Sequence, residues 1–161
     1  MLVGILSDTH GNAAMTAAAV DVLGGRGAEY FIHCGDVGSQ RVLDALAGLP
    51  AAVVLGNVDD LDIEGYAHHL GLRCAGRSDD LTLDDKRIAV LHGDDAALKR
   101  SLLAGQEHDY LLQGHTHVAQ DVRIGRTRII NPGALHRAQR KTVALLNTAR
   151  DRVEFLDVID S

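Results

Sequence analysis

The sequence predicts an α/β fold with a mixed β-sheet system, in which two sheets pack face to face under helices. Three observations lead to this prediction. Apolar runs of strand length alternate with helical patterns early in the chain, antiparallel hairpins follow, and 161 residues are enough to bury a sizeable core. We therefore expect a single domain over residues 1–161.

The N-terminal third has the order strand, helix, strand, helix, strand. Asn12 is placed to cap a helix that runs to about Leu23 and ends at Gly24-Gly25. This alternation implies parallel strands joined by right-handed crossovers. The expected strands are 2–6, 29–33 and 51–55, and the expected helices are 12–23 and 41–47.

The rest of the chain predicts hairpins around one further helix. Residues 80–83 and 87–91 flank a turn at 84–86, which is typical of an antiparallel hairpin. A helix over 95–104 and a strand over 110–112 follow. The tail is hairpin-like, with strands expected at 121–124, 127–130, 142–147 and 152–158.

Composition excludes several functions. Hydrophobic residues make up 46% and charged residues 24% of the chain, which is ordinary for a soluble globular protein. Aromatic residues make up 3%, with no tryptophan, which disfavours a base-stacking platform for single-stranded nucleic acid. A net charge of −6 disfavours binding to a phosphate backbone. We expect a small-molecule substrate, with no nucleic-acid or membrane partner, and homo-oligomerisation is left open.

The remaining bulk features predict a cytoplasmic protein. Cys34 and Cys74 form no metal or disulfide motif and are expected to be buried hydrophobes. No uncharged apolar run reaches the ~18 residues of a membrane span, and residues 2–6 are expected to be a strand rather than part of a leader. Half of the basic residues lie in the C-terminal third, where exposed hairpin surface is favoured over a phosphate-binding rim.

Five predicted strands end in a glycine or turn residue accompanied by side chains that can bind metal. Ligands in α/β proteins bind beyond the carboxyl ends of the strands, so we expect these side chains to meet. His115 and His117 are alternate residues, which share a face when the segment is extended. The candidate ligands are Asp8, His10, Asp36, Asn57, His92, His115 and His117.

This pool of carboxylate, imidazole and amide ligands is larger than one tetrahedral zinc ion needs. It suits two divalent ions about 3.5–4 Å apart that share a carboxylate, an arrangement used for phosphoryl chemistry. Such ions would lower the pKa of a bridging water, and the resulting hydroxide would attack phosphorus in line. Without thiolate ligands, Mn²⁺, Fe²⁺, Zn²⁺ and Ni²⁺ are all compatible with the site.

These motifs resemble those of the calcineurin-like metallophosphoesterases, in their small bacterial and archaeal phosphodiesterase branch. The resemblance covers nearly the whole chain and implies a double β-sandwich of two mixed sheets flanked by helices. The motifs are "DTH" at 8–10, "GD" at 35–36, "GNVD" at 56–59, "HG" at 92–93, "GHTH" at 114–117 and "NPG" at 131–133.

The resemblance also implies how the ligands are shared. One ion would be held by Asp8, His10, Asp36 and His117, and the other by Asp36, Asn57, His92 and His115, with Asp36 bridging. Family habit favours Mn²⁺. The expected catalytic residues are Asp36, Asn57, Asp59 and His92, and Asp59 is expected to orient a ligand imidazole such as His10.

Three positions depart from the family pattern. Ser39 replaces an aspartate of the larger members, and Val58 replaces the histidine that protonates the leaving group there. Asp94 follows "HG" where small members often have a second histidine, and its charge is expected to disfavour dianionic monoesters. His33 is expected to support the site rather than bind metal, and His136 is a candidate to overhang it.

The sequence therefore predicts a metal-dependent phosphoesterase, with diesters favoured over monoesters. One alternative is a catalytically weak scaffold that resembles the small retromer subunit of the same fold, although the full ligand set argues against it. Another is a phosphomonoesterase or nuclease of the same superfamily, although the chain lacks the extra segments that those larger enzymes use. The fold alone does not distinguish either alternative from the predicted phosphodiesterase.

Overall fold

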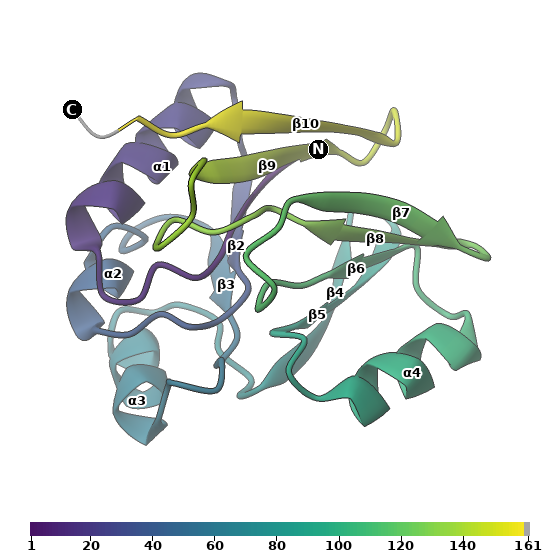
Figure 1. The fold of residues 1–161 in the computed structure, drawn as a ribbon, viewed down its shortest axis with the longest axis horizontal. Helices are drawn as coiled ribbons and strands as arrows, with labels where there is room; N and C mark the ends of the chain where they lie inside the picture. The colour runs from purple at the N-terminus through teal and green to yellow at the C-terminus, as the bar shows by residue number, and fades with distance from the viewer. Residues whose placement is uncertain (160–161) are drawn as a thin grey trace.

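The computed structural model describes residues 1–159, which form two β-sheets and four helices (Figure 1). None of the helices in this part of the chain is long and apolar enough to cross a membrane. The helices are α1 (Ala13–Gly25), α2 (Gln40–Asp44), α3 (Leu61–His69) and α4 (Ala96–Gly105). The strands are β1 (Leu2–Leu6), β2 (Tyr30–His33), β3 (Ala51–Val53), β4 (Ser78–Leu83), β5 (Lys86–Leu91), β6 (Tyr110–Leu112), β7 (Gln120–Ile124), β8 (Thr127–Asn131), β9 (Thr142–Asn147) and β10 (Arg152–Asp157).

Both sheets are mixed and five-stranded. The first has the order β10-β9-β1-β2-β3, and the second has the order β4-β5-β6-β8-β7. In the first sheet β1, β2 and β3 are parallel, and β9 and β10 add antiparallel pairs. In the second, β5, β6 and β8 are parallel, and β4 and β7 pair antiparallel at the two edges. The predicted α/β fold of two packed mixed sheets is confirmed.

Side chains that point to opposite faces of the strands form three separate apolar layers. Val3 and Ile5 of β1 join a cluster between the two sheets, whereas Leu6 joins the cluster beneath α1, α2 and α3. The outer face of the second sheet packs against Leu102 and other leucines of α4. Successive strand residues point to opposite faces, so the buried strands of each sheet contribute to two layers, whereas β7 is exposed along its whole length.

Helix α3 was not among the predicted elements. Only Ile63 and Ala67 of this helix are buried, so the segment lacks the apolar stripe that predicts a helix from sequence. Its start is fixed by Asp60, whose carboxylate accepts hydrogen bonds from the backbone amides of Asp62 and Ile63. A capping residue alone is a weak signal, because aspartate is equally common in turns.

The strand arrangement brings the predicted motifs to one edge. Leu6, His33 and Val53 lie in register across the parallel strands β1, β2 and β3, so the segments that follow them start at the same level. The segments after β5, β6 and β8 leave the second sheet from parallel strands too. The five motifs and the "NPG" segment all follow carboxyl ends of these strands, as expected for a ligand site.

Candidate metal centre

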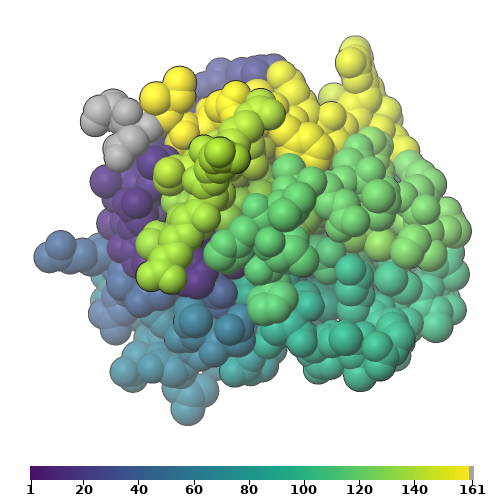
Figure 2. Space-filling model, viewed as in Figure 1, coloured from purple at the N-terminus to yellow at the C-terminus, as the bar shows by residue number. Residues whose placement is uncertain are grey.

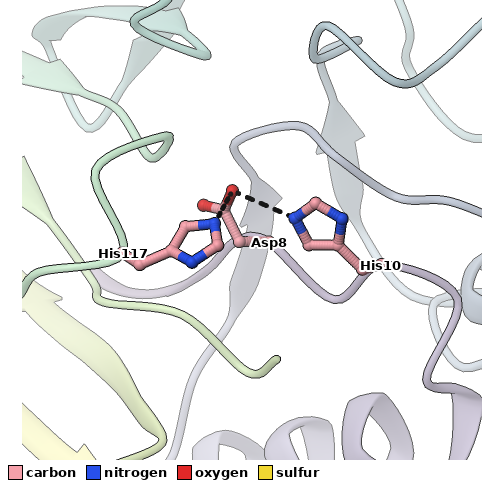
Figure 3. Close-up of side chains that lie close together, drawn as sticks. All are labelled: Asp8, His10 and His117. Atoms are coloured by element: carbon pink, nitrogen blue, oxygen red, sulfur yellow. Dashed lines mark ion pairs between the residues drawn. The ribbon is translucent and has the colours of Figure 1, made fainter. Parts of the chain in front are cut away.

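Asp8 is fixed at the end of β1 with one carboxylate oxygen held and the other left open. Its Oδ2 accepts hydrogen bonds from the Ser7 hydroxyl at 2.7 Å and the His115 backbone amide at 3.1 Å. Its buried Oδ1 has no hydrogen-bond partner within residues 1–159. This atom lies 3.2 Å from Nε2 of His117 and 3.7 Å from Nε2 of His10 (Figure 3). Asp8 therefore presents a single oxygen to two imidazoles.

Asp36 has the same arrangement at the end of β2. Its Oδ1 accepts a hydrogen bond from the Val58 amide at 3.2 Å. Its Oδ2 lies 3.1 Å from Nε2 of His92 and 3.4 Å from Nε2 of His10. Burial opposes ionisation, but the neighbouring His92 ring, the Val58 amide and His10 together lower the pKa of Asp36 to about 2. Asp36 is therefore a carboxylate at neutral pH.

His92 is oriented for ligation by a backbone carbonyl. Its Nδ1 donates to the Cys34 carbonyl oxygen, and the two atoms are 2.8 Å apart. A carbonyl oxygen only accepts, so the neutral ring carries its proton on Nδ1 and a lone pair on Nε2. Nε2 lies 3.1 Å from Asp36 Oδ2 and 3.9 Å from Asp8 Oδ1. Metal-binding histidines commonly use their second nitrogen in this way.

The other two predicted ligands lie at the margin of this cluster. The His115 ring is exposed, and its centroid is 5.1 Å from that of His92. Asn57 is also exposed and follows Gly56, where a Cβ atom would collide with Oδ1 and the backbone of Asp36. Ligation by Asn57 and His115 stays a prediction.

Close-set ligand atoms form two groups that share a carboxylate. One group contains Asp8, His10 and His117, and the other contains Asp8, Asp36 and His92. Asp8 therefore belongs to both groups, whereas the family resemblance gives Asp36 the bridging role. Asp36 Oδ2 also faces an imidazole of each group, His10 and His92. The bridging role of Asp36 stays a prediction.

The backbone at the cluster is strained. Left-handed backbone angles cost of order 1–3 kcal/mol for residues other than glycine, and such residues gather at functional sites. Among residues 1–159, ten residues other than glycine have positive φ, and five of them are candidate ligands: Asp8 (55°), His10 (44°), Asp36 (56°), His115 (72°) and His117 (64°). The fold keeps this strain where the predicted ligands converge.

The polar atoms at the centre of the cluster suit a bound cation. In the part of the chain that the structure describes, Asp8 Oδ1, His10 Nε2 and His92 Nε2 are all buried without a hydrogen-bond partner. Leaving such atoms unsatisfied is costly, and buried charges are normally paired or bound to metal. The carboxylate and imidazole donors match divalent transition-metal ions. The residues present therefore fit metal binding.

Asp59 differs from its predicted role. Its carboxylate accepts hydrogen bonds from the backbone amides of Val37 at 3.0 Å, Gly38 at 2.9 Å and Gly56 at 2.9 Å. These bonds join the loop after β2 to the loop after β3, and within residues 1–159 no imidazole donates to this carboxylate. The sequence could not predict these hydrogen bonds, because nearly every residue has a backbone amide and a motif does not show which amides lie near Asp59. Asp59 positions the loops that carry Asp36 and Asn57.

We expect Asp59→Ala to lower the free energy of unfolding by about 3 kcal/mol or more, because buried amides lose a charged acceptor at about 1–3 kcal/mol each. Urea denaturation measures this change. Asp62→Asn, at an exposed site in the first turn of α3, is the matched control and should change stability by less than about 0.5 kcal/mol. Equal stability of the two variants would refute the role of Asp59.

Two supporting residues escaped the sequence analysis. The Ser7 hydroxyl donates to Asp8, as described above. The Asn131 side chain donates to the Gly114 carbonyl at 2.9 Å and to the Thr116 hydroxyl at 3.1 Å, which holds the loop that carries His115 and His117. The "NPG" motif was noted in the sequence, but its contact with that loop is visible only in the fold.

His33 supports the site from β2, as predicted. Its Nδ1 accepts from the Gly35 amide at 3.1 Å, so the proton lies on Nε2, 3.0 Å from the Thr9 hydroxyl. That hydroxyl donates to the Val37 carbonyl. Burial lowers the pKa of His33 to about 4, so the ring is neutral at physiological pH. This chain of bonds links the loops after β1 and β2.

The surroundings modify two further predictions. Asp94 Oδ2 lies 3.9 Å from Arg77 Nη1, so its repulsion of an anionic substrate is partly offset. The His136 ring lies beside the site, with its centroid 5.1 Å from that of His10. Burial, helped by the neighbouring His10 and Arg137, lowers the pKa of His136.

Most C-terminal arginines pair with aspartates on the hairpin surface, as in Arg123–Asp151, Arg126–Asp109, Arg128–Asp121 and Arg140–Asp157.

Two packed mixed sheets with carboxylates and imidazoles at their joint carboxyl edge define a protein of the metallophosphoesterase class. The model of the calcineurin-like phosphoesterase superfamily domain matches residues 1–151, and the chain belongs to this family. The family resemblance inferred from the motifs is thereby confirmed.

Two relatives from Methanocaldococcus jannaschii are similar to this chain. One, a probable metallophosphoesterase, is 33% identical over an alignment of 145 residues, and the match covers 83% of this chain and 68% of the relative. The other, a phosphodiesterase, is 26% identical over an alignment of 147 residues, and the match covers 83% of each chain. Both names agree with the predicted class of phosphate ester hydrolysis.

Solved structures share the fold. A novel archaeal phosphodiesterase superposes with a TM-score of 0.89 at 21% identity, covering 98% of this chain and 99% of that one. Vps29 of Entamoeba histolytica in complex with Zn²⁺ superposes with a TM-score of 0.69 at 21% identity, covering 99% of this chain and 100% of that one. At these identities the likeness shows the fold alone.

Proposed function

We propose that this protein hydrolyses phosphodiesters with two divalent metal ions at the cluster described above. One observation carries the proposal: Asp8 and Asp36 each have one oxygen fixed by hydrogen bonds and the other facing imidazole nitrogens. The relatives' names, metallophosphoesterase and phosphodiesterase, support the ester class.

The residues that would hold the ions are Asp8, His10, Asp36, Asn57, His92, His115 and His117. When bound, the ions supply an acidified water and positive charge for the phosphoryl oxygens. The protein contributes orientation: Ser7 holds Oδ2 of Asp8 and so orients the open Oδ1, and the Cys34 carbonyl accepts from Nδ1 of His92 and so leaves the lone pair on Nε2. We favour Mn²⁺, with Zn²⁺, Fe²⁺ and Ni²⁺ compatible with the same donors.

Val58 supports a preference for esters with good leaving groups. Its side chain is 52% exposed and cannot donate a proton, while its amide binds Asp36 Oδ1. A positioned general acid is worth about 10²–10⁴ in rate. Without one at this position, aryl phosphodiesters should react fast and alkyl esters slowly.

Val58→His should accelerate the hydrolysis of alkyl diesters by up to about 10²–10⁴-fold and change aryl diesters little. The measurement is a Brønsted plot over substituted phenyl diesters and one alkyl diester with saturating Mn²⁺. Val122→His, at a site 41% exposed on β7, is the matched control and should leave the slope unchanged. A flat plot for the unmodified protein would show that another group donates the proton, and His136 would be tested first.

A scaffold without catalytic activity is the alternative from a different class, since Vps29 structures share the fold. The convergence of unpartnered ligand atoms favours catalysis. A panel of monoesters, diesters and cyclic nucleotides, assayed with each candidate metal, separates the possibilities. Hydrolysis of diesters only supports the proposal, monoester hydrolysis favours the phosphomonoesterase reading, and inactivity with every metal favours the scaffold.

A further inference from the structure

A groove of about 550 Å³ opens beside the candidate metal centre. It lies between the segment that enters β7 and the loop that follows β8, and Figure 2 shows the yellow-green loop running beside the green segment. His117 lines the groove and also faces Asp8 Oδ1. The groove is therefore continuous with the centre, and it is large enough to hold a small organic group.

The walls of the groove combine apolar surface with free amides. Phe155 and Val118 line it, and Phe155 also packs against the cluster between the sheets, so its ring is held in place. Gln120 and Gln139 line it too, and within residues 1–159 neither side-chain amide makes a hydrogen bond. An apolar ring with donors and acceptors on its edge matches these walls.

The groove carries one unpaired positive charge. Arg137 lines it at a left-handed φ of 53° and forms no ion pair within residues 1–159. The other charges are paired, because Asp121 binds Arg128 and Arg140 binds Asp157. An uncompensated guanidinium beside a metal centre favours a phosphate on the occupant.

The centre also has an exposed side, at Val58, a residue that does not line the groove. Val58 is 52% exposed and lies beside Asp36, whereas the groove begins at His117. A leaving group needs a path to solvent, which the Val58 side provides. The group that stays on phosphorus is the one that a walled groove would hold.

We propose that this groove binds a nucleoside as the retained group of the substrate, an inference that rests on the proposed phosphodiesterase function. The base lies along Phe155 with its edge toward Gln120 and Gln139, and Arg137 contacts the phosphate. In the reaction, the oxygen of water forms a new bond to phosphorus, the P–O bond to the leaving group breaks, and one proton of that water ends on the leaving oxygen to give the alcohol. The products are a nucleoside 5′-monophosphate and the alcohol.

The test compares two diesters with the same leaving group, thymidine 5′-(4-nitrophenyl phosphate) and methyl 4-nitrophenyl phosphate, at saturating Mn²⁺. We expect KM to be at least tenfold lower for the thymidine ester, and Arg137→Gln to reduce this KM ratio severalfold. Arg100→Gln, an exposed change on α4, is the matched control and should preserve the ratio. Equal KM values for the two esters would overturn the proposal.

A binding measurement separates this proposal from the proposed function. Thymidine 5′-monophosphate, titrated into isotope-labelled protein, should shift the backbone amide signals of Val118 and Ala138, which line the groove. Methyl phosphate should not. If neither diester is hydrolysed but these shifts occur, the phosphodiesterase function fails and the nucleotide site stands. If both diesters are hydrolysed and the shifts are absent, the nucleotide site fails alone.

Discussion

Replacing Asp36 by asparagine is expected to lower turnover by roughly 10³-fold. Asp36 Oδ2 faces both His10 and His92, and its pKa of about 2 keeps it charged. The amide removes the negative charge that divalent ions require, and a metal contributes several kcal/mol to stabilisation of the transition state. Each tenfold in rate corresponds to about 1.4 kcal/mol. Steady-state hydrolysis of an aryl phosphodiester, with and without added Mn²⁺, measures the loss.

The Asp36→Asn experiment needs a readout besides activity. Metal content should fall together with turnover, while the folded state should persist because the asparagine oxygen can still accept from the Val58 amide. Asp62→Asn, on the exposed surface of α3, should retain both turnover and metal content. Turnover near that of the unmodified protein would show that Asp36 is not a ligand, and the assignment would then have to move to Asp8.

Apolar runs of strand length carried the prediction of the fold. Residues 2–6 are apolar throughout, because Val3 and Ile5 join the layer between the sheets and Leu6 joins the layer beneath the helices, and such a run is visible without a structure. The pairing of β9 with β1 is different. Those strands are far apart in the sequence, and nothing in their local pattern names a partner, so the distribution of the ten strands over two sheets had to come from the structure.

The candidate ligands were predictable because each follows a strand. The rule that ligands gather at carboxyl ends of strands turns five distant motifs into one site, and the structure brings Asp8, His10, Asp36, His92 and His117 together. The rule predicts where the candidate ligands lie, but it does not predict which atoms each of them contacts.

Support for the ligands was predicted less well because it is made by the backbone. Asp59 binds amides, and His92 donates to a carbonyl, so neither partner appears as a residue type in a motif. Ser7 was missed for a different reason: its hydroxyl donates to the Asp8 side chain, but a serine before an aspartate is common in loops. Geometry decides these roles, and the backbone geometry here includes left-handed angles at Asp8 and Asp36.

Chelation should abolish diester hydrolysis and lower the melting temperature. Asp8 Oδ1, His10 Nε2 and His92 Nε2 are buried without hydrogen-bond partners among the described residues, so the fold retains an electrostatic cost that bound cations relieve. Ligand binding stabilises by about 4.1 kcal/mol at a thousand times Kd, and about 1 kcal/mol corresponds to roughly 2–4 °C for a chain of about this size. We expect Mn²⁺ to raise the melting temperature by roughly 10 °C, measured by calorimetry.

The number of metal ions that each chain binds when metal is added back decides between a centre of one ion and a centre of two. The two ligand groups around Asp8 should bind two ions per chain, so elemental analysis after dialysis should approach two. Asp8→Ala removes the oxygen common to both groups and should lose most of the metal-dependent rise in melting temperature. Replacing the exposed His69 of α3 by alanine is the control and should leave that rise in melting temperature unchanged. A metal content near zero with Mn²⁺, Zn²⁺ and Fe²⁺ would contradict the two-metal centre, because the unpartnered atoms would then lack the cations proposed to satisfy them.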